Sequence, residues 1–203
     1  MGYEKVISLF INYFISNNAE RQAEIDRCVH LNHLNPLIDR IVFVYPKEKG
    51  NDRPLFEDYF DKIRKMSGED DINIISNSDI FFDQTLRLVF NMDKNTVYAI
   101  SRWEVESDGS KRMFDNTGGS QDSWVFRGIP RKTLRGDILI GVDGCDNRLA
   151  YCLINEAGYR VINPVRFIHA NHVHLSKHRT YNHNDAICRP WSNVSVASDI
   201  NEL

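Results

Sequence analysis

The chain has 203 residues, of which 42% are hydrophobic and 26% are charged, and its formal net charge is −3. These values are typical of a globular protein, and the length favours one domain. The charge excludes the basic surface of a nucleic-acid-binding protein. No apolar run approaches the roughly 20 residues that span a bilayer, and Met1 to Lys5 lack a signal-peptide pattern. The four cysteines form no CxxC motif, which favours a reducing, cytoplasmic location.

The first half of the chain alternates between strand and helix patterns. Apolar runs of strand length occupy 6–11, 41–45 and 72–75, and helix patterns follow them at 17–35, 54–67 and 83–90. Asn17 and Glu20 resemble a capping box for the first helix, and Pro54 suits the first turn of the second. This order predicts a single α/β domain with a mostly parallel open sheet and helices on both faces.

The second half of the chain is less regular. Strands are expected at 97–102, 121–126, 161–162 and 167–168, and a helix is expected at 146–157, ending before Gly158. Residues 106–121 are rich in Ser, Asp, Gly and Asn and predict a long loop, which is usually functional or disordered. The predicted domain covers 1–175, and we expect 176–203 to be an extension that wraps around it or is partly disordered.

A polar segment directly follows the buried strand at 72–75. Asn77, Ser78 and Asp79 stand where open α/β sheets bind ligands, beyond the carboxyl end of a strand. Mg²⁺ and Mn²⁺ are often held by one or two carboxylates together with substrate phosphates, so Asp79 alone is enough for a cation site. The other interpretation is a turn, with Asp83 capping the next helix.

Three further acids stand near the ends of predicted elements. Asp122 precedes Trp124 at the mouth of a strand, where partial desolvation would suit it to act as a general base; otherwise it is a solvated acid in a turn. Asp143 and Asp146 flank the start of the 146–157 helix, and we expect one of them to cap it.

Basic and histidine side chains complete the set of candidates. Arg102 and Arg148 are suited to a diphosphate or to ion pairs with these acids. His169, His172 and His174 follow the last predicted strand. On an extended segment the last two point to one face, where they could bind a metal ion or phosphate, or else form ordinary hydrogen bonds.

Four segments, taken in order and spacing, resemble certain small bacterial and viral glycosyltransferases with the GT-A type of fold. The resemblance runs from about Val6 to about Leu175. The segments are Asn77–Asp83, Ala99–Trp103, Ser120–Phe126 and Gly144–Arg148.

The resemblance implies a nucleotide-diphospho-sugar transferase that moves a sugar, from a UDP-sugar by preference, to an acceptor hydroxyl during surface polysaccharide or glycan assembly. It places the metal-binding acid on Asp79, for Mn²⁺ or Mg²⁺, although Asn77 replaces the first acid of the family's motif. His172 or His174 would complete the metal or diphosphate site, and Asp122 would be the base of an inverting reaction. The implied donor site is Asn77, Ser78, Asp79 and Arg102, and the implied pocket residues are Trp103, Trp124, Asp143, Asp146, Asn147 and Arg148.

Residues 107–120 could close over the donor and exclude water.

Two other functions fit the same residues. One is a nucleotide- or sugar-binding domain without activity, which the missing first acid favours. The other is a metal-dependent hydrolase that uses His172 and His174 with Asp79 or Asp122, which requires three protein ligands around an open metal position.

Overall fold

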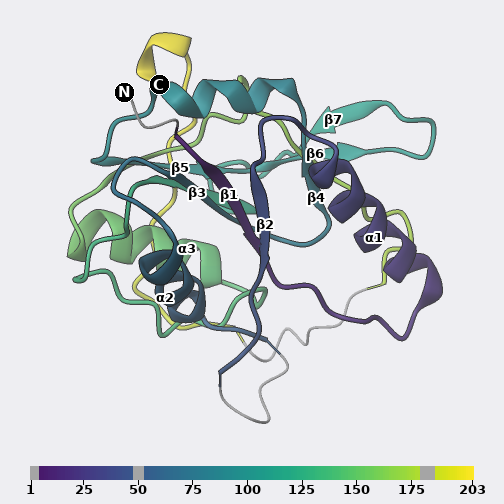
Figure 1. The fold of residues 1–203 in the computed structure, drawn as a ribbon, viewed down its shortest axis with the longest axis horizontal. Coiled ribbons are helices and arrows are strands. Elements are labelled where there is room, and N and C mark those ends of the chain that lie inside the picture. The colour runs from purple at the N-terminus through teal and green to yellow at the C-terminus, as the bar shows by residue number, and fades with distance from the viewer. Residues whose placement is uncertain (1–4, 48–52, 179–185) are drawn as a thin grey trace.

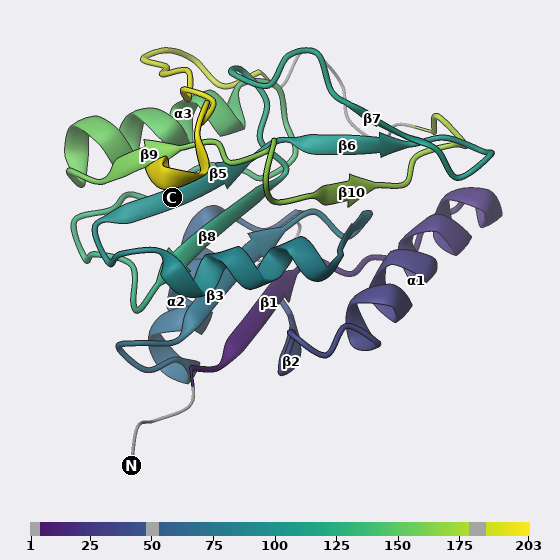
Figure 2. The same ribbon diagram turned by 90° about the horizontal axis from the view of Figure 1, so that it is seen from above.

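Two β-sheets organise the computed structural model, which describes residues 5–47, 53–178 and 186–203 (Figures 1 and 2). The main sheet has six strands in the order β2-β1-β3-β8-β5-β9. Strand β8 runs antiparallel to both of its neighbours, whereas β1–β2, β1–β3 and β5–β9 are parallel pairs. The strands are β1 Ile7–Ile11, β2 Arg40–Phe43, β3 Ile72–Ser76, β5 Thr96–Ile100, β8 Ser123–Arg127 and β9 Arg160–Ile162.

The α/β class is confirmed, and the main sheet is mixed. A second sheet, which was not predicted, has the order β4-β10-β6-β7. It forms from one local hairpin and from β10, which pairs with β4 and β6 over long sequence distances. Within 106–121, β7 forms a hairpin with β6, and the strand expected at 167–168 is wrong because the pairing strand is β10. These strands are β4 Ile80–Phe82, β6 Arg102–Val105, β7 Lys111–Met113 and β10 Ala170–His172.

The helices lie close to their predicted positions, with shifted ends. Helix α1, Ala19–His33, is capped by Asn18 rather than Asn17: the Asn18 side chain accepts a hydrogen bond from the backbone N–H of Arg21 at 2.8 Å. Helix α2, Phe56–Met66, starts after Pro54 because Leu55 first bridges to Leu139.

Shorter helical segments follow within the described residues. Asp83 caps the 3₁₀ helix η1, Gln84–Asn91, as the turn interpretation predicted. Helix α3, Cys145–Tyr151, continues as a π-turn, η2, over Cys152–Glu156, and η4 covers Ile200–Glu202. Among the described residues, none of these helices has the length and apolar character needed to cross a membrane.

Apolar side chains cover both faces of the main sheet. Along β8, Trp124 and Phe126 join the cluster that packs under α2 and α3, whereas Val125 between them joins the cluster under η1. Figure 1 shows the sheet between η1 (teal) on one side and α2 and α3 on the other, and α1 lies alongside the second sheet, next to β4. The two apolar layers fix the sheet, and with it the position at which β1 and β3 end.

The described part of the C-terminal extension, residues 186–203, packs on the domain. Val194 and Ala197 are buried. The N–H of Val194 donates to Gly118 O at 2.9 Å, and the N–H of Ala197 donates to Asn163 O at 2.9 Å. The extension therefore lies against the loop that leads into β8. Residues 179–185, which belong to the predicted extension, lie outside the described residues.

Candidate functional site

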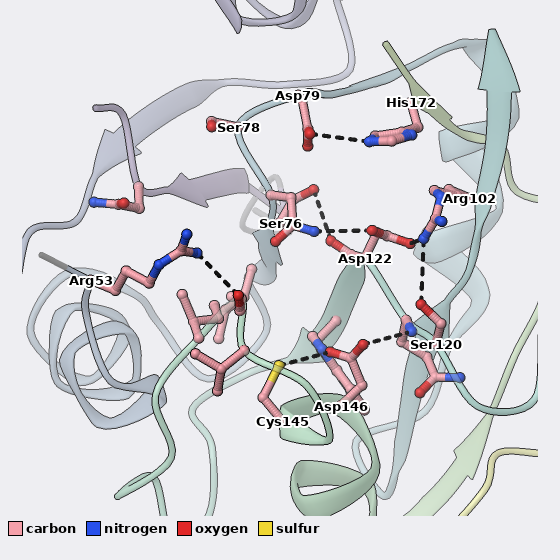
Figure 3. A pocket seen from close by; sticks show the side chains of 18 of the residues that line it. Arg53, Ser76, Ser78, Asp79, Arg102, Ser120, Asp122, Cys145, Asp146 and His172 are labelled. Carbon is pink, nitrogen blue, oxygen red and sulfur yellow. Dashed lines mark hydrogen bonds and ion pairs between the residues drawn. The ribbon is translucent and has the colours of Figure 1, made fainter. Parts of the chain in front are cut away.

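A cleft of about 390 Å³ opens beyond the carboxyl ends of β1 and β3 and the amino end of β8 (Figure 3). Four parts of the chain supply most of its lining. They are residues 12 and 14 after β1, 76–79 after β3, 119–122 before β8 and 140–147 at the start of α3. His172, His174 and Arg21 complete the wall on the side of the second sheet. The cleft thus gathers the candidate segments around 79, 122 and 146, which are far apart in sequence.

Asp79 lies in the short turn between β3 and β4 and is buried. Its Oδ2 accepts from the Arg21 guanidinium and from Nε2 of His172, the latter at 3.1 Å. Burial alone would raise the pKa of Asp79, but the positive charges of His172 and Arg21 hold it well below its usual range. Asp79 is therefore a fully ionised carboxylate inside the protein.

His172 is held between two carboxylates. Its Nδ1 contacts Oε2 of Glu104 at 2.7 Å, while Nε2 contacts Asp79. Burial alone would lower the pKa of His172, but Asp79 and Glu104 raise it to about 10. Burial would likewise raise the pKa of Glu104, and the hydrogen bond from His172, aided by Arg102, lowers it to about 2. His172 is an imidazolium in this arrangement, and binding a metal ion through Nε2 would displace the proton that it donates to Asp79.

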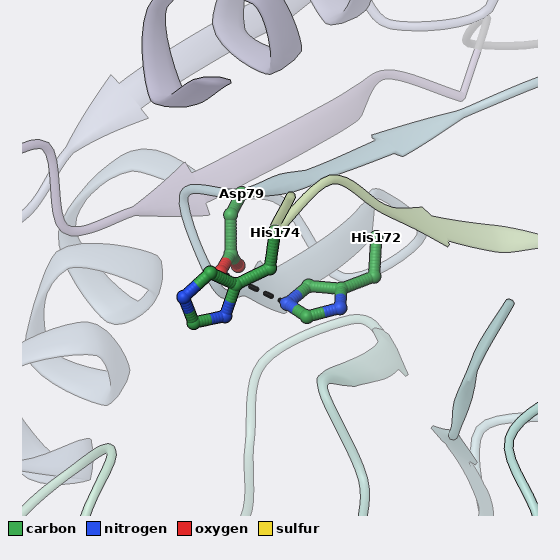
Figure 4. A group of neighbouring side chains, drawn as sticks. All are labelled: Asp79, His172 and His174. Atoms are coloured by element: carbon green, nitrogen blue, oxygen red, sulfur yellow. Dashed lines mark hydrogen bonds and ion pairs between the residues drawn. The ribbon is translucent and has the colours of Figure 1, made fainter. Parts of the chain in front are cut away.

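Asp79, His172 and His174 form a group that could hold a metal ion (Figure 4). One ligand atom of each lies within 4.8 Å of the others. The Asp79 Oδ1 atom is buried and has no hydrogen-bond partner among the described residues, which fits an oxygen kept for a cation. Burial lowers the pKa of His174, which favours the neutral imidazole that binds metals. One carboxylate and two imidazoles suit Mn²⁺ and also Zn²⁺.

Asp122 is tied to the segment after β3. Its Oδ1 accepts from Nδ2 of Asn77 at 3.0 Å, and its Oδ2 accepts from Nη1 of Arg102 at 3.1 Å. The amide of Asn77 therefore holds the Asp122 carboxylate in the cleft. An acid at position 77 would face Asp122 at hydrogen-bond distance, and two like charges there would repel each other. The amide of Asn77 can donate to Asp122, which a carboxylate at that position could not do.

Asp146 is the carboxyl group whose environment favours its neutral form. Its Oδ2 accepts from the N–H of Gln121 at 3.2 Å, and its Oδ1 accepts from Sγ of Cys145 at 3.5 Å. Burial, together with the nearby charge of Asp122, raises the pKa of Asp146 to about 7. A carboxyl group with such a pKa can exchange a proton near neutral pH.

The predicted capping of the helix by Asp143 or Asp146 is wrong. The residue that caps α3 is Gly144, at φ 81°, and no side chain bonds to the helix end there. A Cβ on Gly144 would lie 3.0 Å from both Ile187 O and the Trp191 ring. Glycine suits both the left-handed conformation and this close approach.

An Asp146→Asn variant is expected to change how stability depends on pH. Because folding raises this pKa, the stability that Asp146 contributes is complete below pH 4 and is lost as pH rises through about 7. Between pH 5 and pH 8 the free energy of unfolding of the wild type should fall by about 2.6 kcal/mol more than that of the variant. Urea denaturation at both pH values measures this. Asp115→Asn, at a side chain that is 94% exposed, is the control, and parallel pH profiles for wild type and Asp146→Asn would contradict the burial argument.

The structure divides the other predicted pocket residues. Asp143 and Asn147 line the cleft, and Trp124 lies in its wall at 2% exposure. Two residues lie outside its lining. Trp103 donates its Nε1–H to Val165 O at 2.8 Å and packs on His169. Arg148 donates to Pro190 O at 3.4 Å and lies 3.7 Å from Glu156. Trp103 and Arg148 therefore connect neighbouring segments of the chain outside the cleft lining.

Sequence reasoning missed several residues of the cleft and its surroundings. Arg21 and Glu24 are buried on the inner face of α1, although charges there suggest an exposed helix face. Arg53 donates to Gly141 O at 3.1 Å from the loop before α2. A signal was present: Arg21, Ile25, Cys28 and Asn32 recur with helical spacing, so a charged residue shared the buried stripe.

In comparisons with known proteins, no family model, no curated protein and no solved structure matches the chain.

Proposed function

We propose that the chain is a nucleotide-sugar-dependent glycosyltransferase, with a UDP-sugar as the favoured donor and a sugar or glycan hydroxyl as the acceptor. One observation carries the proposal. The possible cation group around Asp79 and the carboxyl pair Asp122 and Asp146 open into one cleft beyond the carboxyl ends of the parallel strands β1 and β3. Ligands of open α/β sheets bind at this edge. The resemblance to GT-A glycosyltransferases adds the reaction class, with surface polysaccharide or glycan assembly as the setting.

Asp79, His172 and His174 would hold Mn²⁺ or Mg²⁺, which supplies positive charge against a departing diphosphate. The protein itself contributes Arg21 and Arg102, whose guanidinium groups line the cleft on either side of Asp79 and His172. They would orient a diphosphate through fixed donors, because Arg21 is buried, Arg102 is half-buried, and carboxylates hold both. Asn77 and Ser78 present short polar side chains beside them.

Two carboxyl groups compete for the role of proton acceptor in an inverting transfer. The resemblance favours Asp122, but both of its oxygens accept hydrogen bonds from Asn77 and Arg102. Asp146 has a pKa of about 7, which matches a base that works near neutral pH. If Asp146 takes the proton, kcat/KM rises through pH 7 and Asp146→Asn removes this rise. If Asp122 takes it, Asp122→Asn causes the larger loss of kcat.

A metal-dependent hydrolase is the second candidate function. The observation in its favour is that Asp79, His172 and His174 supply three donor atoms around one position, as a catalytic zinc site requires. Metal analysis of the purified protein separates the two functions. Tightly bound zinc supports the hydrolase, whereas a cation retained only with a nucleotide supports the transferase.

A cytoplasmic location is part of the proposal. Cys28, Cys145, Cys152 and Cys188 are free thiols, as expected in a reducing compartment.

Thermal unfolding with a panel of nucleoside diphosphates and nucleotide sugars, with and without Mn²⁺, tests the proposed function. A ligand at a hundred times its Kd stabilises the folded state by about 2.7 kcal/mol. We expect one nucleoside diphosphate to raise the melting temperature, with a larger increase in Mn²⁺. His174→Ala should reduce the Mn²⁺ increment, and the control His33→Ala, on α1, should not. No increase with any nucleotide would refute the transferase.

A further inference from the structure

Seven ionisable side chains form a continuous chain of alternating charge along one side of the cleft. In order they are Glu24, Arg21, Asp79, His172, Glu104, Arg102 and Asp122. Beyond the close Arg21–Asp79 contact, their links measure 3.0 Å (Glu24–Arg21), 3.1 Å (Asp79–His172), 2.7 Å (His172–Glu104), 2.6 Å (Glu104–Arg102) and 3.1 Å (Arg102–Asp122). The chain joins the possible cation group at Asp79 to the candidate base at Asp122.

These charges are shielded from water. The seven side chains are at most 22% exposed. Charges with so little solvent around them are screened weakly and interact more strongly than surface pairs. Removing the charge of one residue in this chain therefore changes the electrostatic energy of its neighbours.

Glu104 is the central link. Its Oε1 accepts from Nε of Arg102 at 2.6 Å, and its Oε2 contacts Nδ1 of His172 at 2.7 Å. One oxygen thus binds the partner of Asp122 and the other binds the partner of Asp79. Glu104 is absent from the cleft lining, whereas both of its partners are part of it (Figure 3). It acts on the cleft through them.

The second sheet fixes this arrangement. Strands β6 and β10 pair in parallel, with His172 opposite Glu104 and Ala170 opposite Arg102. Facing positions on neighbouring strands hold their side chains at contact distance. Neither His172 nor Arg102 can move far without changing its contact with Glu104.

We propose that Glu104 is a positioning residue that couples the two ends of the cleft. Through it, the negative charge of Asp122 affects how tightly a cation binds at Asp79. The inference rests on the proposed function only in placing a cation at Asp79. A carboxylate that holds the second nitrogen of a metal-binding histidine commonly orients it, and its loss typically costs 10- to 100-fold in metal affinity. Here the same carboxylate also restrains Arg102, the partner of Asp122.

A double-mutant cycle with Mn²⁺ as the probe tests the coupling. Calorimetric titration at one pH compares wild type, Asp122→Asn, Glu104→Gln and the double variant. Glu104→Gln should weaken Mn²⁺ binding about 10- to 100-fold. Asp122→Asn, away from the cation group, should weaken it about fivefold in the wild type and less than about twofold in the Glu104→Gln background, because interacting sites are not additive. Glu106→Gln, at an exposed position just beyond β6, is the matched control and should change neither value.

Equal effects of Asp122→Asn in both backgrounds, or no Mn²⁺ binding by the wild type, would overturn the proposal. If Glu104→Gln does not fold, Glu104→Asp replaces it, since a side chain one methylene shorter cannot reach both partners. The readout uses Mn²⁺ alone and is independent of nucleotides. Coupling without any nucleotide binding would refute the transferase and leave the role of Glu104 intact.

Discussion

An Asp79→Ala variant is expected to lower the free energy of unfolding by about 3–5 kcal/mol, the cost of leaving a buried ion without its partner. In the wild type, the Asp79 carboxylate compensates both Arg21 and His172. After its removal His172 can lose its proton, but Arg21 stays charged and keeps Glu24 as its carboxylate partner, beside a hydrogen bond to Val173 O. Urea denaturation at pH 7 measures the change.

The double variant Arg21→Met, Asp79→Ala supplies the control for this prediction. Replacing a buried ion pair by apolar groups costs less than breaking it, so the double variant should recover part of the stability lost in Asp79→Ala. A single variant as stable as the wild type would contradict the picture of a compensated buried charge. Because this variant is destabilised, its activity must be divided by its folded fraction before a loss is assigned to catalysis.

An Ala197→Asp variant is expected to be destabilised by about 3 kcal/mol or more, because it buries a carboxylate without a partner. Ala197 is 0% exposed and lies in the cluster under η1. Its N–H also ties the C-terminal extension to Asn163. Since the same extension holds Gly118 through Val194, the loop before Asp122 should loosen as well.

Ser195→Asp is the matched control for this prediction, because it adds the same charge two residues away at an exposed position. It should leave the melting temperature nearly unchanged. Thermal unfolding and limited proteolysis of both variants measure the difference. Equal stability of the two would show that the extension contributes little to the fold.

Local patterns were enough to predict the strands of the main sheet and the helices in the first half of the chain, but not β4. The buried strands β1 and β3 are continuous apolar runs, and α2 presents Phe56, Tyr59 and Ile63 at helical spacing. These features depend on residues close in sequence. The predicted position of Asp79, just after β3, followed from the same reasoning.

The second sheet and the charge chain depend on contacts between distant residues, which no local pattern contains. Strand β10 pairs with β6 some 68 positions away, as the His172–Glu104 contact shows. Three-residue strands such as β4 and β10 are too short for a periodic signal. Arg21 is buried only because Asp79, 58 positions further along the chain, lies opposite it.

The reversed direction of β8 has a consequence for how this cleft can vary. Strands β1 and β3 end at the cleft. Strand β8 runs in the opposite direction and begins there, directly after the segment that follows the β6–β7 hairpin. One wall is therefore set by the sheet, and the opposite wall by a connection whose exposed tip at 106–111 lies outside both cores. Changes in that tip can reshape one side of the cleft while the segment around Asp79 stays in place, which gives the fold a fixed half and a variable half.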